Sequence, residues 1–150
     1  MTDNPMPLEL EHKLYYEGIH LFNEHEFFEA HETWEDIWRT ACGRKYDFYQ
    51  GMIQCAVALE HYLRSNPRGV LSLYNSYRPK FAKLPPVFMG LDVPAFLSHM
   101  HTALRPVLEA SPIPEKGQIH LDPATAPHIE LKYDPFETGE ALKYNKLDHS

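Results

Sequence analysis

Apolar residues recur every three or four positions up to about residue 108, which is the spacing of one helix face. Asn23 and Glu26 are placed to form a capping box, and Asn66 and Asp92 are suitable N-caps because a proline follows each within two residues. Pro79 is expected to kink its helix or to end it early. Together these signals predict five helices, at about residues 7–23, 26–41, 47–65, 67–84 and 92–108.

The pattern changes after residue 110. Polar and apolar residues alternate at 118–121 and 128–133, which predicts extended segments laid against a surface. We therefore expect an all-α fold with a helical domain at residues 1–110. A Pro-rich tail at residues 111–150 should wrap around this domain and fray over its last ten residues. Long helices are excluded from the tail by its prolines, Pro112, Pro114, Pro123, Pro127 and Pro135.

The predicted helix at residues 26–41 carries both tryptophans of the chain together with many carboxylates. Trp34 and Trp38 fall on its apolar stripe, so we expect both in the core, with each indole N–H bonded to a Glu or Gln side chain. His31 and Glu35 are four residues apart and therefore stack on the edge of that stripe. Glu32 lies further round the helix.

The predicted helix at residues 47–65 is rich in small residues and nearly uncharged, so it should be the central, most buried helix. Gly51 inside it indicates that another backbone comes close. Gln50, Gln54 and His61 share one face of this helix. Because only a short turn connects it to the preceding helix, the two should pack antiparallel and bring their polar faces together. Such buried groups must be hydrogen-bonded to one another or bind something.

Composition narrows the classes of function. A net charge of −7 argues against a nucleic-acid binder, which needs a basic face. No cluster of lysines and arginines marks an anionic membrane partner, no apolar run could span a bilayer, and the first residues lack the apolar region of a secretory signal. Cys42 and Cys55 form neither a CxxC motif nor a disulfide framework, so we expect a cytoplasmic protein.

Two motifs are specific. Residues 28–38 read FEAHExWExxW, and residues 49–56 read YQGxIQxA, followed by His61. In this order they resemble the family catalogued as "domain of unknown function 309", over roughly residues 10–84. The resemblance implies a small all-helical fold, and some members of that family carry the label of metal-dependent hydrolase. Ser65 and Pro79 depart from the usual pattern of the family.

The polar cluster has two interpretations. In the first, His31, Glu35 and His61 ligate a divalent metal such as zinc and leave one position open for water. Glu32 would then act as the catalytic general base. In the second, His31 and Glu35 form an ion pair or hydrogen bond that only fixes the helix against its neighbour.

The two interpretations correspond to two functions. One is a metal-dependent hydrolase of a small polar substrate. The other is a non-catalytic helical interaction module that binds a partner protein. Gln50 and Gln54, placed as second-shell or ligand-binding groups, favour the module slightly, because glutamine is a poor ligand for transition metals and a good partner for a carboxylate. Since a small bundle rich in aromatic residues often has apolar surface left to bury, a homodimer is a further expectation.

Overall fold

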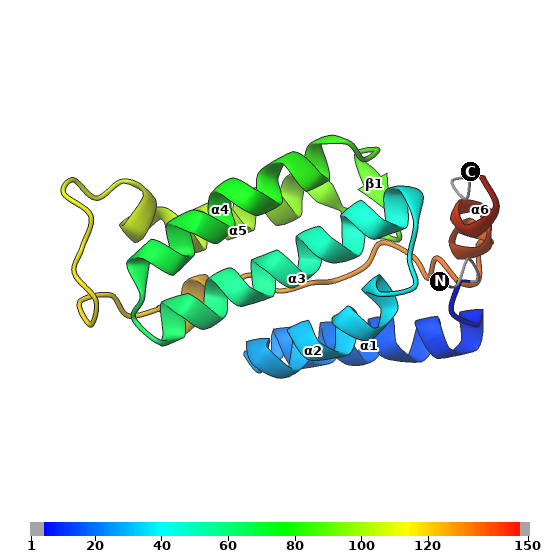
Figure 1. The fold of residues 1–150 in the computed structure, drawn as a ribbon, viewed down its shortest axis with the longest axis horizontal. Coiled ribbons are helices and arrows are strands. Elements are labelled where there is room, and N and C mark those ends of the chain that lie inside the picture. Colours follow the sequence, from blue (N-terminus) through cyan, green and yellow to red (C-terminus); the bar gives the residue numbers. More distant parts are fainter. Residues whose placement is uncertain (1–4, 148–150) are drawn as a thin grey trace.

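The computed structural model describes residues 5–147 and is built mainly from α-helices, which confirms the predicted fold class. Figure 1 shows α3 running between α4 on one side and the pair α1 and α2 on the other, with α5 behind α4. None of the helices in the described part is long and apolar enough to cross a membrane. Along the chain the elements are α1 (Leu8–Asn23), α2 (Phe27–Trp38), α3 (Gly43–Leu63), α4 (Pro67–Ala82), β1 (Val87–Phe88), β2 (Leu91–Asp92), α5 (Val93–Leu108), the 3-10 helix η1 (Pro123–Thr125) and α6 (Glu140–Leu147).

Two helix starts lie where their caps predicted them. The side chains of Asn66 and Asp92 accept hydrogen bonds from the main-chain N–H groups three residues later, at 3.4 and 3.1 Å. Of the two outcomes expected at Pro79, a kink or an early end of the helix, the early end is wrong, because α4 continues through this proline to Ala82. Tyr77 and Phe81 are buried on either side of this proline, so packing on the core holds the turn in place.

Asn23 does not cap α2, contrary to the prediction. It is the last residue of α1, and its side-chain amide holds both main-chain groups of Ile129. Nδ2 donates to the carbonyl oxygen at 2.9 Å, and Oδ1 accepts from the N–H at 2.7 Å. Glu26 precedes α2 and makes no side-chain capping bond. A residue that looked like a local cap is therefore a tether for a segment more than 100 residues away.

The central position of α3 is as predicted, since most of its apolar side chains are buried. Gly51 faces α4, where the ring of Phe81 would lie 2.8 Å from a Cβ atom at this position. The close neighbour is therefore a side chain and not the backbone that the sequence suggested. This contact lets two helices of the core approach each other through an aromatic ring.

The contact between α1 and α2 centres on Trp34, which is fully buried. Its indole lies directly over Gly18, where any Cβ atom would overlap the ring. The indole Nε1 donates to the main-chain carbonyl of Tyr15 at 3.3 Å, so the expected Glu or Gln partner is wrong. Trp38 is only partly buried and lies against Tyr46, with ring centroids 5.2 Å apart.

The chain between α5 and α6 is tied to the helical body at several points. The N–H of Ile119 donates to the Ser65 hydroxyl at 3.0 Å, and the N–H of Lys132 donates to the Gly90 carbonyl at 2.8 Å. Figure 1 shows this segment, in orange, returning toward the end of the molecule where α1 begins.

The chain then forms α6, where the sequence suggested a frayed end. Ala141 and Tyr144 of α6 are buried, and the ring of Tyr144 packs on Phe88 with centroids 4.6 Å apart. Phe88 belongs to the antiparallel pair β1 and β2, in which it lies opposite Leu91. Because α6 depends on this distant hairpin, its local sequence gave little sign of it. Residues 148–150 of the predicted frayed end lie outside the described range.

Candidate functional site

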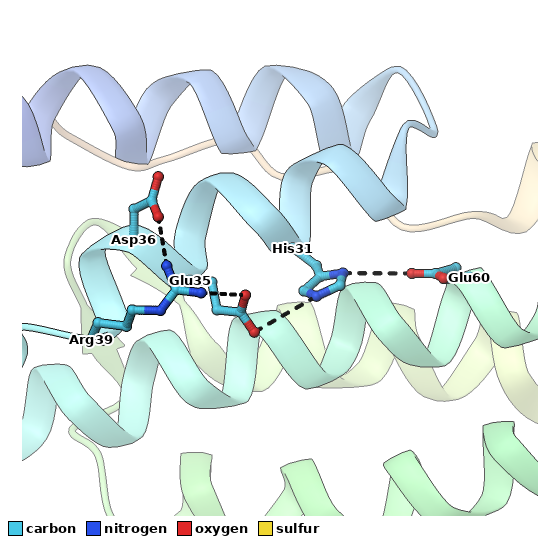
Figure 2. Close-up of polar contacts among 5 residues, drawn as sticks. All are labelled: His31, Glu35, Asp36, Arg39 and Glu60. Atoms are coloured by element: carbon cyan, nitrogen blue, oxygen red, sulfur yellow. Dashed lines mark hydrogen bonds and ion pairs between the residues drawn. The ribbon is translucent and has the colours of Figure 1, made fainter.

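The polar residues of α2 meet α3 at His31. Its imidazole lies between two carboxylates, with Nε2 3.8 Å from Oε2 of Glu35 and Nδ1 3.6 Å from Oε1 of Glu60. Figure 2 shows the ring with one acid from its own helix on one side and one from α3 on the other. These are ion-pair distances for a protonated imidazole. We call Glu35, His31 and Glu60 the His31 clamp.

Each carboxylate of the clamp is also paired with an arginine. The second oxygen of Glu35 lies 3.2 Å from Arg39, and the second oxygen of Glu60 lies 3.0 Å from Arg64. The arginine side chains are 61% and 65% exposed, whereas that of Glu60 is only 14% exposed. These contacts therefore run from one exposed arginine, through the shielded seam between α2 and α3, to the other exposed arginine.

Two other buried polar atoms of these helices have no hydrogen-bond partner within residues 5–147. They are Nε1 of Trp38 and Oε1 of Gln54. Nδ1 of His31 and Oε1 of Glu60 also face each other at 3.6 Å, beyond hydrogen-bond distance. The mutually bonded network that the sequence suggested is thus incomplete. An indole N–H and an amide oxygen left in this state are ordinarily satisfied by water or by a bound group.

The remaining predicted site residues lie elsewhere. His61 faces α4, with Nδ1 3.1 Å from the side-chain nitrogen of Asn66 and its ring against Gly69. Glu32 is exposed and makes no hydrogen bond or ion pair with the part of the chain that the structure describes. Gln50 is half-buried and likewise makes none there. The residue of α3 that meets His31 is therefore not the predicted His61 but its neighbour in the sequence.

The ligands predicted for zinc are not brought together. His31 and Glu35 are adjacent, but His61 turns toward the opposite neighbour of α3. Among the described residues, no group of three or more His, Cys, Asp or Glu side chains is arranged to hold a metal ion. The donor set needed for a catalytic zinc with an open position is thus not assembled between α2 and α3.

A second polar cluster is more deeply buried and was not predicted. Lys45 donates from Nζ to Oε1 of Glu11 at 2.9 Å and to Oδ1 of Asn145 at 2.7 Å, and the Tyr49 hydroxyl donates to the other oxygen of Glu11 at 2.7 Å. The side chains of Glu11 and Lys45 are each 3% exposed. Burial lowers the pKa of the Lys45 ammonium, while the Glu11 carboxylate acts to raise it. This cluster joins α1, α3 and α6.

The sequence contained a signal for this cluster. Lys45 lies three and four residues before Phe48 and Tyr49, on the apolar stripe of the most buried helix. Glu11 stands four residues before Tyr15, on the buried stripe of α1. A charged residue on such a stripe needs an opposite charge nearby. The pattern does not say which charge on another helix supplies it.

Buried tyrosines make the stability of the protein sensitive to alkaline pH. Burial raises the pKa of Tyr15 and Tyr49 well above the usual range, and burial together with a hydrogen bond to Glu140 raises the pKa of Tyr133 to about 12. The unfolded chain releases these protons near pH 10, about where a free tyrosine titrates. The free energy of unfolding should therefore be at its full value below about pH 10 and decrease as the pH rises further.

Urea denaturation followed by circular dichroism across this pH range tests the expectation. The decrease should become less steep in Tyr49→Phe, because one of the retained protons is then absent. A stability that stays constant from neutral pH to about pH 11 would contradict the burial of these hydroxyls.

Comparison with known proteins gives a match to a protein family over part of the chain. The comparison with curated proteins found no match to the chain. The family described as "Domain of unknown function (DUF309)" matches residues 15–73, from within α1 to within α4. This stretch contains both sequence motifs and the whole His31 clamp, whereas α5, the following segment and α6 lie outside it. The resemblance carried by the motifs is thereby confirmed over residues 15–73, which match the DUF309 family model.

Proposed function

We propose that this chain is a non-catalytic helical interaction module of the cytoplasm, in which the His31 clamp fixes helix packing and the surface binds a partner protein. The observation that carries the proposal is the position of the imidazole between two carboxylates on different helices. Both cysteines are free thiols, which suits a reducing compartment. The motif residues would then stabilise the helix packing that supports a binding surface elsewhere on the molecule.

The clamp is suited to setting the register of α2 on α3. His31 and Glu60 are 19% and 14% exposed, so any charge on the imidazole is less screened from the carboxylate than in a fully solvated pair. Sliding α2 by one turn would separate the two side chains and leave the poorly solvated carboxylate with Arg64 alone. Arg39 and Arg64 hold the outer oxygens of the two acids and so orient them toward the ring. A shielded pair of this kind is suited to specifying one packing arrangement of the two helices.

The hydrolase interpretation has less support from this geometry. It needs a base beside an ion that keeps an open position for water. Glu32, the candidate base, projects into solvent, and His61 has a side-chain partner at the start of α4. His31 already lies between two carboxylates, and Glu35 is already paired with Arg39. A clamp uses the same residues without requiring further donors.

Glu60→Gln tests the clamp. It removes the charge that faces both His31 and Arg64 and should lower the free energy of unfolding by about 1 kcal/mol, since the carboxylate is partly shielded. For a chain of this size that corresponds to a fall in Tm of about 2–4 °C. The matched control is Glu32→Gln, the same change at an exposed position of α2, which should alter stability by less than about 0.5 kcal/mol. Thermal unfolding followed by circular dichroism measures both.

Zinc titration of the same proteins by calorimetry separates the two functions. The module should bind no stoichiometric zinc that depends on His31. Stoichiometric binding that disappears in His31→Ala would overturn the proposal in favour of a metal site. Equal thermal stability of Glu60→Gln and the wild type would show that the cluster does not fix the packing.

A further inference from the structure

The exposed side of α5 carries a stripe of residues that line hollows in the surface. Asp92, Ala95, His99, Thr102 and Pro106 follow one another at intervals of three or four positions, so they share one face of the helix. Three hollows of about 280, 340 and 310 Å³ open along this face. Each has α5 as one wall and the segment that returns from α5 toward α6 as the other.

Neighbouring hollows have lining residues in common. The first and second share His99 and His128, and the second and third share Thr102 and Thr125. From Asp92 to Pro106 this row of hollows is roughly 20 Å long at the rise of an α-helix. We call it the α5 trough. An extended peptide of about six residues has the same length.

The main chain of the outer wall has unused hydrogen-bonding groups at one end of the trough. Asn23 binds both the N–H and the C=O of Ile129, so the backbone is extended there and both groups point toward α1. In an extended chain the groups of the adjacent residues, His128 and Glu130, point the opposite way. Within the described part of the chain, no group hydrogen-bonds to the main chain of either residue. They form a short free edge that another strand could pair with.

The carboxylates that line the trough have three histidines beside them, His99, His120 and His128, but no lysine or arginine among the described residues of the lining. Asp92 and Glu130 line one end and Asp122 lines the other, and none of the lysines or arginines within residues 5–147 lines any of the three hollows. Lys132 approaches the rim, but its ammonium is 3.9 Å from Asp92 and 55% exposed. The chain as a whole has a net charge of −7. A cationic occupant is complementary to this surface.

We propose that the α5 trough binds an extended, basic segment of a partner protein. The segment pairs through its main chain with His128 and Glu130 and directs lysine or arginine side chains to Asp92, Glu130 and Asp122. This is strand addition to a free edge, in which main-chain bonds supply affinity and the rim charges supply specificity. Small side chains along the trough, at Ala95, Thr102 and Ala126, leave space for the peptide on either side of His99. The inference rests on the proposed function and names the partner of the module.

The test is a selection of random peptides of about eight residues, displayed on phage, against the full chain and against Thr102→Arg in parallel. Thr102 is exposed on α5, so an arginine there should occupy the space at the centre of the trough and repel a basic peptide, without disturbing the core. Peptides enriched on the wild type should be net positive. Their synthetic copies should bind Thr102→Arg at least about tenfold more weakly in calorimetry. N-methylation at alternate residues of the peptide should weaken binding as much, because it removes main-chain donors.

Two tail variants provide a matched pair for the charge argument. Glu130→Lys should weaken binding of the selected peptide several-fold. Glu137→Lys, which makes the same change in net charge at an exposed site outside the trough, should leave it nearly unchanged. Basic peptides that bind Thr102→Arg as well as the wild type would overturn the trough as their site while leaving the module function intact. Selection that enriches no peptide, or only acidic or neutral ones, would overturn the inference. The Glu60→Gln and zinc experiments would still test the proposed function independently.

Discussion

Lys45→Met is expected to lower the free energy of unfolding by about 3–5 kcal/mol. Methionine keeps the length of the side chain, so the change removes the charge and creates little cavity. Glu11 would remain as a carboxylate that is 3% exposed and whose one remaining side-chain hydrogen bond within residues 5–147 comes from the Tyr49 hydroxyl. An uncompensated charge in such a place is far more costly than the loss of a surface pair, because water cannot replace the missing ammonium. Urea denaturation followed by circular dichroism measures the loss.

Two comparisons identify the cause of that loss. Lys83→Met removes an ammonium that is 64% exposed and 3.8 Å from Asp47, and it should change stability by less than about 1 kcal/mol. Adding Glu11→Gln to Lys45→Met should recover part of the loss, because the neutral amide can still accept from Tyr49 without needing a cation. If the double variant is as unstable as the sum of both single changes, the two side chains do not interact and the pair is not the origin of the effect.

The buried pair also shows where inference from the sequence stops. Glu11 and Lys45 are charged residues on otherwise apolar, buried helix faces, so the sequence alone showed that each was unusual. The two paired residues are 34 positions apart in the sequence, and Asn145 follows Lys45 by a further 100 positions. Local periodicity carries no information on such partners. The helices themselves could be predicted because the spacing of apolar residues and the caps at Asn66 and Asp92 are local features.

The candidate site illustrates the same limit at the scale of one residue. Helical spacing placed His31 and Glu35 together correctly, since both lie on α2. It could not decide whether Glu60 or His61 would meet them, because adjacent residues of a helix point about 100° apart. The answer depends on how α3 is rotated between α2 and α4. Gly69 is small enough for the His61 ring to lie against α4, and this rotation leaves Glu60 facing α2.

Gly18→Ala is expected to destabilise the protein by about 3 kcal/mol, although alanine is the better helix former by about 1 kcal/mol. A Cβ atom at this position of α1 would overlap the indole of Trp34. That ring has little freedom to move away, because it is fully buried, bonded to the Tyr15 carbonyl and packed 5.9 Å from the ring of Phe22. The steric penalty should therefore exceed the gain in helix propensity. Thermal unfolding and urea denaturation, both followed by circular dichroism, measure the difference.

A double-mutant cycle attributes this effect to the indole. Trp34→Phe alone should be destabilising, because it removes a hydrogen bond and leaves a cavity. In the presence of Gly18→Ala the smaller ring provides space for the new methyl group, so the double variant should be more stable than the sum of the single effects by at least about 1 kcal/mol. Glu17→Ala, an alanine substitution at the exposed neighbouring position, controls for helix propensity. A rise in stability on Gly18→Ala would mean that α1 and α2 do not approach each other at this glycine. The packing of α2 on α1 described above would then be wrong.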